Sequence, residues 1–366
     1  MAMNRPDGKR TGSIGSLNGL KAAAMILVFW WHSPMNKPDS PDLGLRMCEI
    51  FFVLSGFLVG VNHWDDEYPD VLRASYAYWK SKFLKIWPLH LIAFVIDCGA
   101  SLIQSGRAFA TRENALYALF NLGLLHAWGT DSKLYFSFNG ATWFLSALLF
   151  CYLLAPVVIS HFRKYRQPAL PFIFFIAVRI LLEYLNRRRH WYGITFDFHV
   201  APFIHLLEFC AGLTMAPAFF SGRKLLQGRK RLPLLFSLLE IAGLAAYVYF
   251  AGFHFHGWLG GYYVLAACVL VLILSFQLGA VSRILSARPF SFFSSVQLEF
   301  FILHQAVFHF FQRCFPDSAS NPVLFSVLLF LLTTGLAFLY QKTLAKKATL
   351  LLEKILFRIR KAIIAE

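Results

Sequence analysis

The sequence has little charge and few cysteines. Only 15% of its 366 residues are Asp, Glu, Lys or Arg, whereas about a quarter is usual for a soluble domain. No polar block of domain size, about 100 residues, interrupts the apolar segments, which argues against an appended soluble domain. The six cysteines are scattered without a CxxC spacing, so we expect neither structural disulfides nor zinc or iron-sulfur sites. The sequence also lacks a nucleic-acid-binding module, so we expect no nucleic acid as a partner.

Apolar and aromatic residues dominate the chain instead. Hydrophobic residues make up 58% of it, including 40 Phe, and the mean hydropathy is +0.56. A transmembrane helix needs about 20 mainly apolar residues, and such segments recur along the whole sequence. We therefore predict an all-α polytopic membrane protein with about ten transmembrane helices. The expected spans are residues 14–33, 44–63, 86–104, 143–160, 168–184, 198–218, 234–252, 258–277, 293–312 and 322–341.

The positions of the basic residues predict the topology. The net charge of +16 comes mostly from short loops between the spans, and the positive-inside rule places such loops in the cytoplasm. An even number of spans must then separate any two of these loops. Counting the short apolar run 113–127 as a span would make one of these numbers odd, so we predict that it is a re-entrant or interfacial helix on the outer side. We expect both termini inside and residues 105–142 and 186–197 outside. The arginines at 187–189 break the rule, either as a tolerated exception or as a contact for an anionic glycan.

The chain divides into a membrane domain, residues 1–341, and a tail, residues 342–366. The tail alternates basic and apolar residues at helical spacing, which is typical of amphipathic helices on membrane surfaces. We expect it on the inner surface, with its cations on anionic lipids. Membrane lipids are therefore expected partners, and the expected location is the cytoplasmic (inner) membrane.

Two histidines, His32 and His304, lie inside predicted spans. A titratable ring in hydrocarbon is costly and usually marks a functional site, although either ring could simply be a hydrogen-bonded interior group. His32 follows Lys21 by eleven residues, or about 16 Å of helix, so it lies toward the outer end of its span. There a neutral imidazole can act as a general base on a hydroxyl that arrives from outside. Glu49, near the start of the next span, is a candidate partner for His32.

Three lysines form a candidate anion site. Lys82 and Lys85 are three residues apart on one helical face, and Lys21 lies at the inner part of the first span. Lysines bind phosphates as point charges, so together they could hold an anionic group that arrives from the cytoplasm. The alternative is that Lys82 and Lys85 belong to an ordinary positive-inside loop.

Ser55 and Gly56 lie in the apolar segment FFVLSGFLVG. The serine could be a nucleophile, but the segment lacks the G-x-S-x-G pattern of a nucleophile elbow. Small residues in membrane helices let two backbones approach closely. We therefore predict that this pair serves helix packing.

Other polar groups at membrane depth are expected to make structural hydrogen bonds. Asp97, His126 and Glu208 belong to this set. His254 and His256 form an HxH pair in an expected outer loop, but they lack the third ligand that a zinc site needs. We predict no metal site.

Six segments follow one another in a recognisable order. They are SLNGLKAAAMILVFWWHS, EIFFVLSGFLVG, KFLKIWPL, ATWFLSALLFCYLLAPVV, FIHLLEFCAGLTMA and SSVQLEFFILHQAVF. In this order they resemble the acyltransferase family 3 membrane proteins, from about residue 14 to 340. The resemblance implies a ten-helix enzyme that moves an acyl group, typically acetyl, from cytoplasmic acyl-CoA to a hydroxyl of a glycan or other acceptor at the outer face. In the family, arginines occupy the positions of Lys21, Lys82 and Lys85, so the charge is kept and the bidentate fork is lost.

The resulting hypothesis is a membrane O-acyltransferase that modifies a cell-surface polysaccharide or a lipid-linked carbohydrate by O-acetylation. His32 would deprotonate the acceptor hydroxyl or take the acyl group itself. Glu49 or Glu299 would orient an imidazole, and His304 would assist in the site.

The three lysines would hold the phosphates of acyl-CoA, expected to be acetyl-CoA. It would be a donor substrate rather than a permanently bound cofactor. The alternative function is a transporter or flippase for a lipid-linked sugar, in which buried His and Glu residues relay protons. Against it, the sequence shows no inverted repeat. A non-enzymatic scaffold is a weaker third reading.

Overall fold

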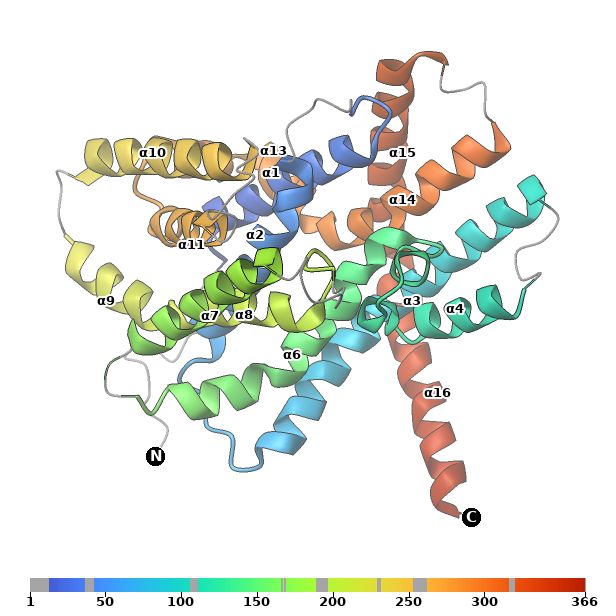
Figure 1. Ribbon diagram of the computed structural model, residues 1–366, viewed down its shortest axis with the longest axis horizontal. Coiled ribbons are helices and arrows are strands. Elements are labelled where there is room, and N and C mark those ends of the chain that lie inside the picture. Colours follow the sequence, from blue (N-terminus) through green and yellow to red (C-terminus); the bar gives the residue numbers. More distant parts are fainter. Residues whose placement is uncertain are drawn as a thin grey trace.

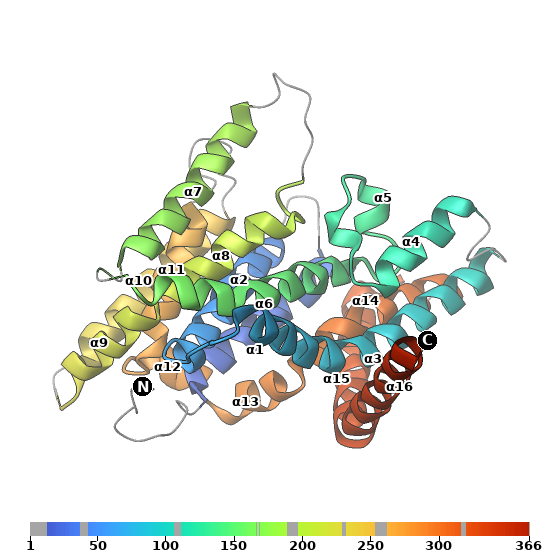
Figure 2. The same cartoon turned by 90° about the horizontal axis from the view of Figure 1, so that it is seen from below.

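The computed structural model describes residues 13–36, 43–105, 111–165, 167, 169–188, 197–228, 232–252, 262–315 and 320–365. Within these ranges every regular element is a helix, from α1 to α16 with two short 3-10 segments. Figure 1 shows the helices gathered into one bundle, and Figure 2 shows the same bundle turned by 90°. The predicted all-α fold is confirmed.

Seven helical segments in the described ranges are long and apolar enough to cross a membrane. They are α2 (Leu43–His63), α3 (Val71–Ser105), α6 (Trp143–Phe162), α7 (Ala169–Arg188), α8 (Pro202–Thr214) continued by α9 (Ala216–Leu226), α10 (Leu232–Gly252) and α15 (Pro322–Thr343). The other three predicted spans are occupied by α1 (Gly15–His32), α11 (Tyr262–Ser275) and α14 (Gln297–Cys314). The chain is therefore a polytopic membrane protein with about ten membrane helices.

The shorter helices connect these spans. They are α4 (Arg112–Leu122), η1 (His126–Trp128), α5 (Ser132–Tyr135), η2 (Gly140–Thr142), α12 (Ala280–Leu285) and α13 (Arg288–Ser295). Helix α4 corresponds to the apolar run 113–127. Its 11 residues extend about 16 Å, too short for a crossing. Its end is tied to α3, because His90 Nε2 donates to the Asn121 carbonyl at 2.9 Å. The predicted sidedness stays a prediction, and residues 189–196 of the basic loop lie outside the described ranges.

Helix α2 lies in the middle of the bundle and packs against α8 (Figure 1). The two backbones touch at glycines. A Cβ atom on Gly56 would lie 1.8 Å from the Phe209 carbonyl oxygen, and one on Gly212 would lie 2.0 Å from the Val53 carbonyl oxygen. No other residue fits at either position. The predicted packing role of Gly56 is confirmed.

The tail forms α16 (Ala345–Ala365), which projects from the body of the bundle in Figure 1. Apolar side chains such as Leu351 and Phe357 are exposed on it, and so are Lys347 and Lys354. Exposed apolar and basic side chains on one helix agree with the predicted amphipathic tail. Its place on the inner membrane surface stays a prediction.

Candidate active site

His32 and His304 lie side by side, although 272 positions separate them in the sequence. Their ring centroids are 5.1 Å apart at an interplanar angle of 65°. His32 is the last residue of α1 and is half-buried, whereas His304, in the middle of α14, is fully buried. The fold therefore unites the two histidines that the sequence singled out.

Backbone carbonyls fix the protonation of both rings. His32 Nδ1 lies 2.9 Å from the carbonyl oxygen of Val28, and His304 Nδ1 lies 2.6 Å from that of Phe301. Because a carbonyl oxygen can only accept, each Nδ1 carries the proton and donates it. Each neutral ring then keeps its lone pair on Nε2. The Nε2 atom of His304 is buried and has no hydrogen-bond partner among the described residues.

Glu49 forms its hydrogen bonds with groups other than the two histidines. Its Oε1 accepts hydrogen bonds from Arg46 Nη1 at 3.4 Å and from the Tyr263 hydroxyl at 3.3 Å. Its Oε2 is buried without a hydrogen-bond partner in the described part of the chain. The hydrogen bonds found there do not connect Glu49 with His32 or His304. The predicted orienting role of Glu49 stays a prediction, and the carbonyls already hold both imidazoles.

The three predicted lysines converge on one cavity of about 420 Å³, between α1, α2, α3, α6, α13 and α14. Lys21 and Lys85 line it directly. The Lys82 ammonium lies 5.1 Å from the ring centroid of Tyr152, which also lines the cavity. Lys82 and Lys85 are close enough to Lys21 for their charges to repel, so an anion here would be strongly stabilised. The other polar groups of the lining are Asn18, Ser55, Ser291, Ser294, Ser295, Gln297 and Glu299.

A second, polar cavity of about 570 Å³ lies between α3, α4, α5 and α14. Asp97 is 1% exposed and lines it. Its Oδ1 accepts hydrogen bonds from His309 Nδ1 at 2.6 Å and from Arg313 Nη1 at 3.0 Å. Its Oδ2 is buried without a hydrogen-bond partner among the residues described. A buried carboxylate oxygen of this kind is costly unless a further donor reaches it.

Further side chains of this polar cavity come from α4 and α5. The Tyr117 hydroxyl lies 2.5 Å from Glu113 Oε1 and 2.8 Å from Asp131 Oδ2. These hydrogen bonds, first the one to Glu113, raise the pKa of Tyr117, so it stays a neutral phenol. Lys133 also lines the cavity. The lining thus contains anionic, cationic and neutral polar side chains.

The histidine pair lies between the two cavities along the helix axes. Along α3, Lys85 and Asp97 are about 18 Å apart, and along α14, Glu299 and Arg313 are about 21 Å apart, at 1.5 Å per residue. His304 follows Glu299 by about 7.5 Å on the same scale. The two cavities are therefore separated along α3 and α14, with His304 between them.

Comparison with known proteins assigns the family. The family 3 model of the acyltransferase domain matches residues 14–342. The chain belongs to acyltransferase family 3. It is similar to acyltransferase MdmB of Streptomyces mycarofaciens, at 26% identity over 167 residues, which are 42% of this chain and 41% of that relative. The chain thus matches less than half of the length of this curated relative. No solved structure matches it.

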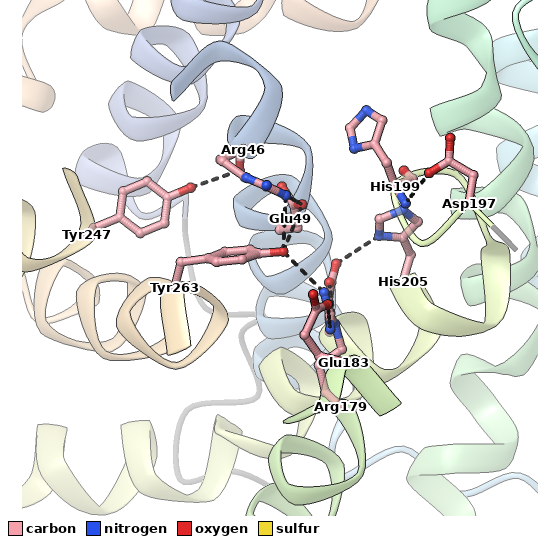
Figure 3. A network of polar contacts seen from close by, with 10 residues as sticks. Arg46, Glu49, Arg179, Glu183, Asp197, His199, His205, Tyr247 and Tyr263 are labelled. Carbon is pink, nitrogen blue, oxygen red and sulfur yellow. Dashed lines mark hydrogen bonds and ion pairs between the residues drawn. The ribbon is translucent and has the colours of Figure 1, made fainter. Parts of the chain in front are cut away.

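This acyltransferase family 3 chain also contains a buried ionic network that the sequence analysis missed (Figure 3). Arg179 donates to Glu208 at 3.0 Å, to Glu183 at 2.9 Å and to the Tyr263 hydroxyl at 3.2 Å. Glu208 also accepts from His205 Nδ1 at 2.8 Å. The network links α7, α8 and α11, and through Tyr263 it reaches Glu49 on α2. A single arginine inside the predicted span 168–184 was the available signal, because charges at membrane depth need partners.

The remaining predictions concern structural groups and metals. The predicted hydrogen bonds of Asp97 and Glu208 are confirmed, and His126 Nε2 lies 3.3 Å from the Thr142 hydroxyl. Within the described ranges, no group of three or more His, Cys, Asp or Glu could hold a metal ion. His254 and His256 lie outside those ranges.

Proposed function

We propose that this family 3 protein is a membrane O-acyltransferase that moves an acyl group, first of all acetyl, from acyl-CoA to a hydroxyl of a surface carbohydrate. One observation carries the proposal: two imidazoles with Nε2 lone pairs lie between a cation-lined cavity and a polar cavity that are separated along α3 and α14. In this proposal the lysine end faces the cytoplasm, and the protein resides in the cytoplasmic membrane. Family membership favours the enzyme over the transporter that the sequence left open.

The lysine cavity suits the donor. Acyl-CoA carries several phosphates, and Lys21, Lys82 and Lys85 supply point charges for them. The hydroxyls of Ser291, Ser294 and Ser295 on α13 can donate to the same oxygens. Because these contacts are charged and reversible, acyl-CoA binds as a substrate and leaves as CoA.

The histidine pair suits proton transfer. His32 Nε2 takes the proton of the acceptor hydroxyl while that oxygen attacks the thioester carbonyl carbon. The carbon–oxygen bond forms, the carbon–sulfur bond breaks, and the proton passes to the departing CoA thiolate, which leaves as the thiol. The Val28 carbonyl stabilises the positive imidazolium in between through the Nδ1–H bond. His304, whose Nε2 is unoccupied by any described residue, assists in relaying the proton.

The polar cavity suits the acceptor. Its lining offers carboxylates, a guanidinium, an ammonium and hydroxyls, which match the alternating donors and acceptors of a polyhydroxylated molecule. Arg313 and Lys133, which line this cavity, can donate to sugar oxygens. We therefore propose that a cell-surface glycan or a lipid-linked carbohydrate enters from this side and becomes O-acetylated.

Two measurements test the function. The full-length protein in vesicles should release free CoA thiol from acetyl-CoA when a carbohydrate acceptor is present, and His32→Ala should stop this release. Mass spectrometry of surface glycans from cells with and without the protein should show the gain of one acetyl group per modified hydroxyl. Unchanged glycans together with the absence of thiol release would refute the enzyme.

A further inference from the structure

Three phenylalanine rings form the wall of the lysine cavity on the side of the histidine pair. Phe51 of α2, Phe144 of α6 and Phe301 of α14 all line the cavity. The ring centroid of Phe144 lies 6.0 Å from that of Phe51 and 5.3 Å from that of Phe301. The Phe301 ring in turn lies 5.7 Å from the ring of His304. We call these three residues the aromatic wall.

On three helices, a phenylalanine of the aromatic wall is followed in the lining by a polar side chain further from the histidine pair. On α14, Glu299 precedes Phe301 in the direction of His304. On α6, Phe144 and Tyr152, which lies under Lys82, are about 12 Å apart. On α2, which packs beside α1, Ser55 lies about 6 Å from Phe51. An acyl-CoA with its phosphates on the lysines would therefore point its acyl group at the aromatic wall.

The aromatic wall is closely packed. Each of its three side chains is at most 8% exposed. Phe144 is also supported from behind, because its ring lies 4.5 Å from Phe52, which stacks at 4.2 Å on His205 of the ionic network. Close-packed interiors yield little to added volume. A group that passes between these rings must displace them, and the displacement grows with every methylene.

We propose that Phe51, Phe144 and Phe301 form a size filter that restricts transfer to short acyl groups. An acetyl group reaches His304 and His32 with the smallest displacement of the rings, whereas a longer chain stops at the wall. The inference rests on the proposed function, because it requires acyl-CoA in the lysine cavity. It adds the residues that decide which acyl-CoA is used.

A donor series tests the filter. The full-length protein and its Phe144→Ala and Phe301→Ala variants are assayed with acetyl-, butyryl- and hexanoyl-CoA, and kcat/KM is measured for each donor. In the variants, the ratio of hexanoyl to acetyl transfer should rise by roughly tenfold or more, since single methylenes in apolar pockets are worth about that much. Phe51→Leu should raise it by a smaller factor.

Phe325→Ala is the matched control. Phe325 on α15 is 5% exposed and packs on Phe308 at 6.4 Å, but it does not line the lysine cavity. Two results would overturn the filter. One is a ratio of hexanoyl to acetyl transfer that rises as much in Phe325→Ala as in the wall variants. The other is an unchanged ratio in wall variants that still transfer acetyl. Should an alanine variant fail to fold, Phe144→Leu and Phe301→Leu test the same direction.

Different results refute the proposed function and the size filter. A wild-type protein that transfers no acyl group from any thioester refutes the proposed function, and the filter falls with it. A wild type that transfers acetyl, with wall variants that keep its donor preference, refutes the filter alone.

Discussion

The imidazole of His32 donates through Nδ1 to a carbonyl one turn earlier in its own helix. A ring held in this way has one tautomer, and it presents only Nε2 to a reacting molecule. His304 is held by the same kind of bond. The rigid helical backbone therefore does what a carboxylate does in many hydrolases, without placing a second charge at membrane depth.

We predict that His32→Ala lowers acyl transfer by about 10² to 10⁴-fold, the usual cost of losing a general base. His32→Gln should be equally inactive, because an amide can still donate to Val28 but cannot take a proton at neutral pH. Both proteins should insert and purify normally. The measurement is thiol release from acetyl-CoA, and substantial activity in either variant would remove the catalytic assignment. His304→Ala should also be impaired.

Glu49→Gln separates an orienting role from a structural one. Glu49 holds Arg46 and Tyr263 rather than an imidazole, so the loss of its charge leaves Arg46 less well compensated. We expect a lower melting temperature and, in the protein that remains folded, transfer within a few-fold of wild type. Thermal unfolding and transfer are measured on the same preparation. A loss as deep as that of His32→Ala, at unchanged melting temperature, would show that Glu49 acts on the histidines.

At the scale of helices, the lysine cavity lies between Lys21 of α1 and Lys85 of α3, with Lys82 one turn away from Lys85. We predict that Lys82→Gln and Lys85→Gln each raise the KM for acyl-CoA by roughly tenfold, since a hydrogen bond to a charged group contributes about 1.5–3 kcal/mol. The value of kcat should change little. Lys354→Gln on the exposed face of α16 is the control. Wild-type saturation curves for both α3 variants would show that these lysines do not bind acyl-CoA and serve only the topology.

The contact between α2 and α8 depends on two glycines. Gly56→Ala places a Cβ atom 1.8 Å from the Phe209 carbonyl oxygen, so the helices must separate. We expect poor folding or a clearly lower melting temperature. Gly99→Ala is the matched control, because a Cβ atom on this α3 glycine meets nothing within 4 Å and alanine is the better helix former. Equal melting temperatures for the two variants would contradict the close contact.

At this scale, hydropathy predicted the helices well but not their neighbours. Every predicted span overlaps one or two helices, because a run of apolar residues is visible in the sequence itself. The partner of Gly56 was not predictable, since many helices of the chain offer similar apolar faces to lipid and to each other. For the same reason Asp97 could be recognised as a polar group at membrane depth, but its bonds to His309 and Arg313 required the pairing of α3 with α14.

At the scale of the whole molecule, both histidines and all three lysines of the candidate site could be chosen from the sequence, because charges and titratable rings are rare in apolar segments. The groups that hold these side chains in place were harder to predict from the sequence. Every residue has a backbone carbonyl, so nothing in the sequence marks those of Val28 and Phe301 as partners of the rings. Arg179 was visible as a charge inside a predicted span, but its bonds to Glu183, Glu208 and Tyr263 arise only in the folded bundle.

The aromatic wall has an electrical consequence. Where water fills a cavity on each side, a membrane voltage falls almost entirely across the dry layer between them, here the three rings and the histidine pair. In the proposed orientation, the proton that leaves the acceptor oxygen ends on the CoA sulfur, and the acetyl group that leaves this sulfur ends on the acceptor oxygen. This exchange moves no net charge across the layer, whereas a single uncompensated charge that crossed the full voltage would change energy by about 2.3 kcal/mol per 100 mV. Acetyl transfer in vesicles should therefore run equally fast at an inside-negative potential and after an ionophore has abolished it, and a clear difference in rate would mean that an uncompensated charge crosses the layer.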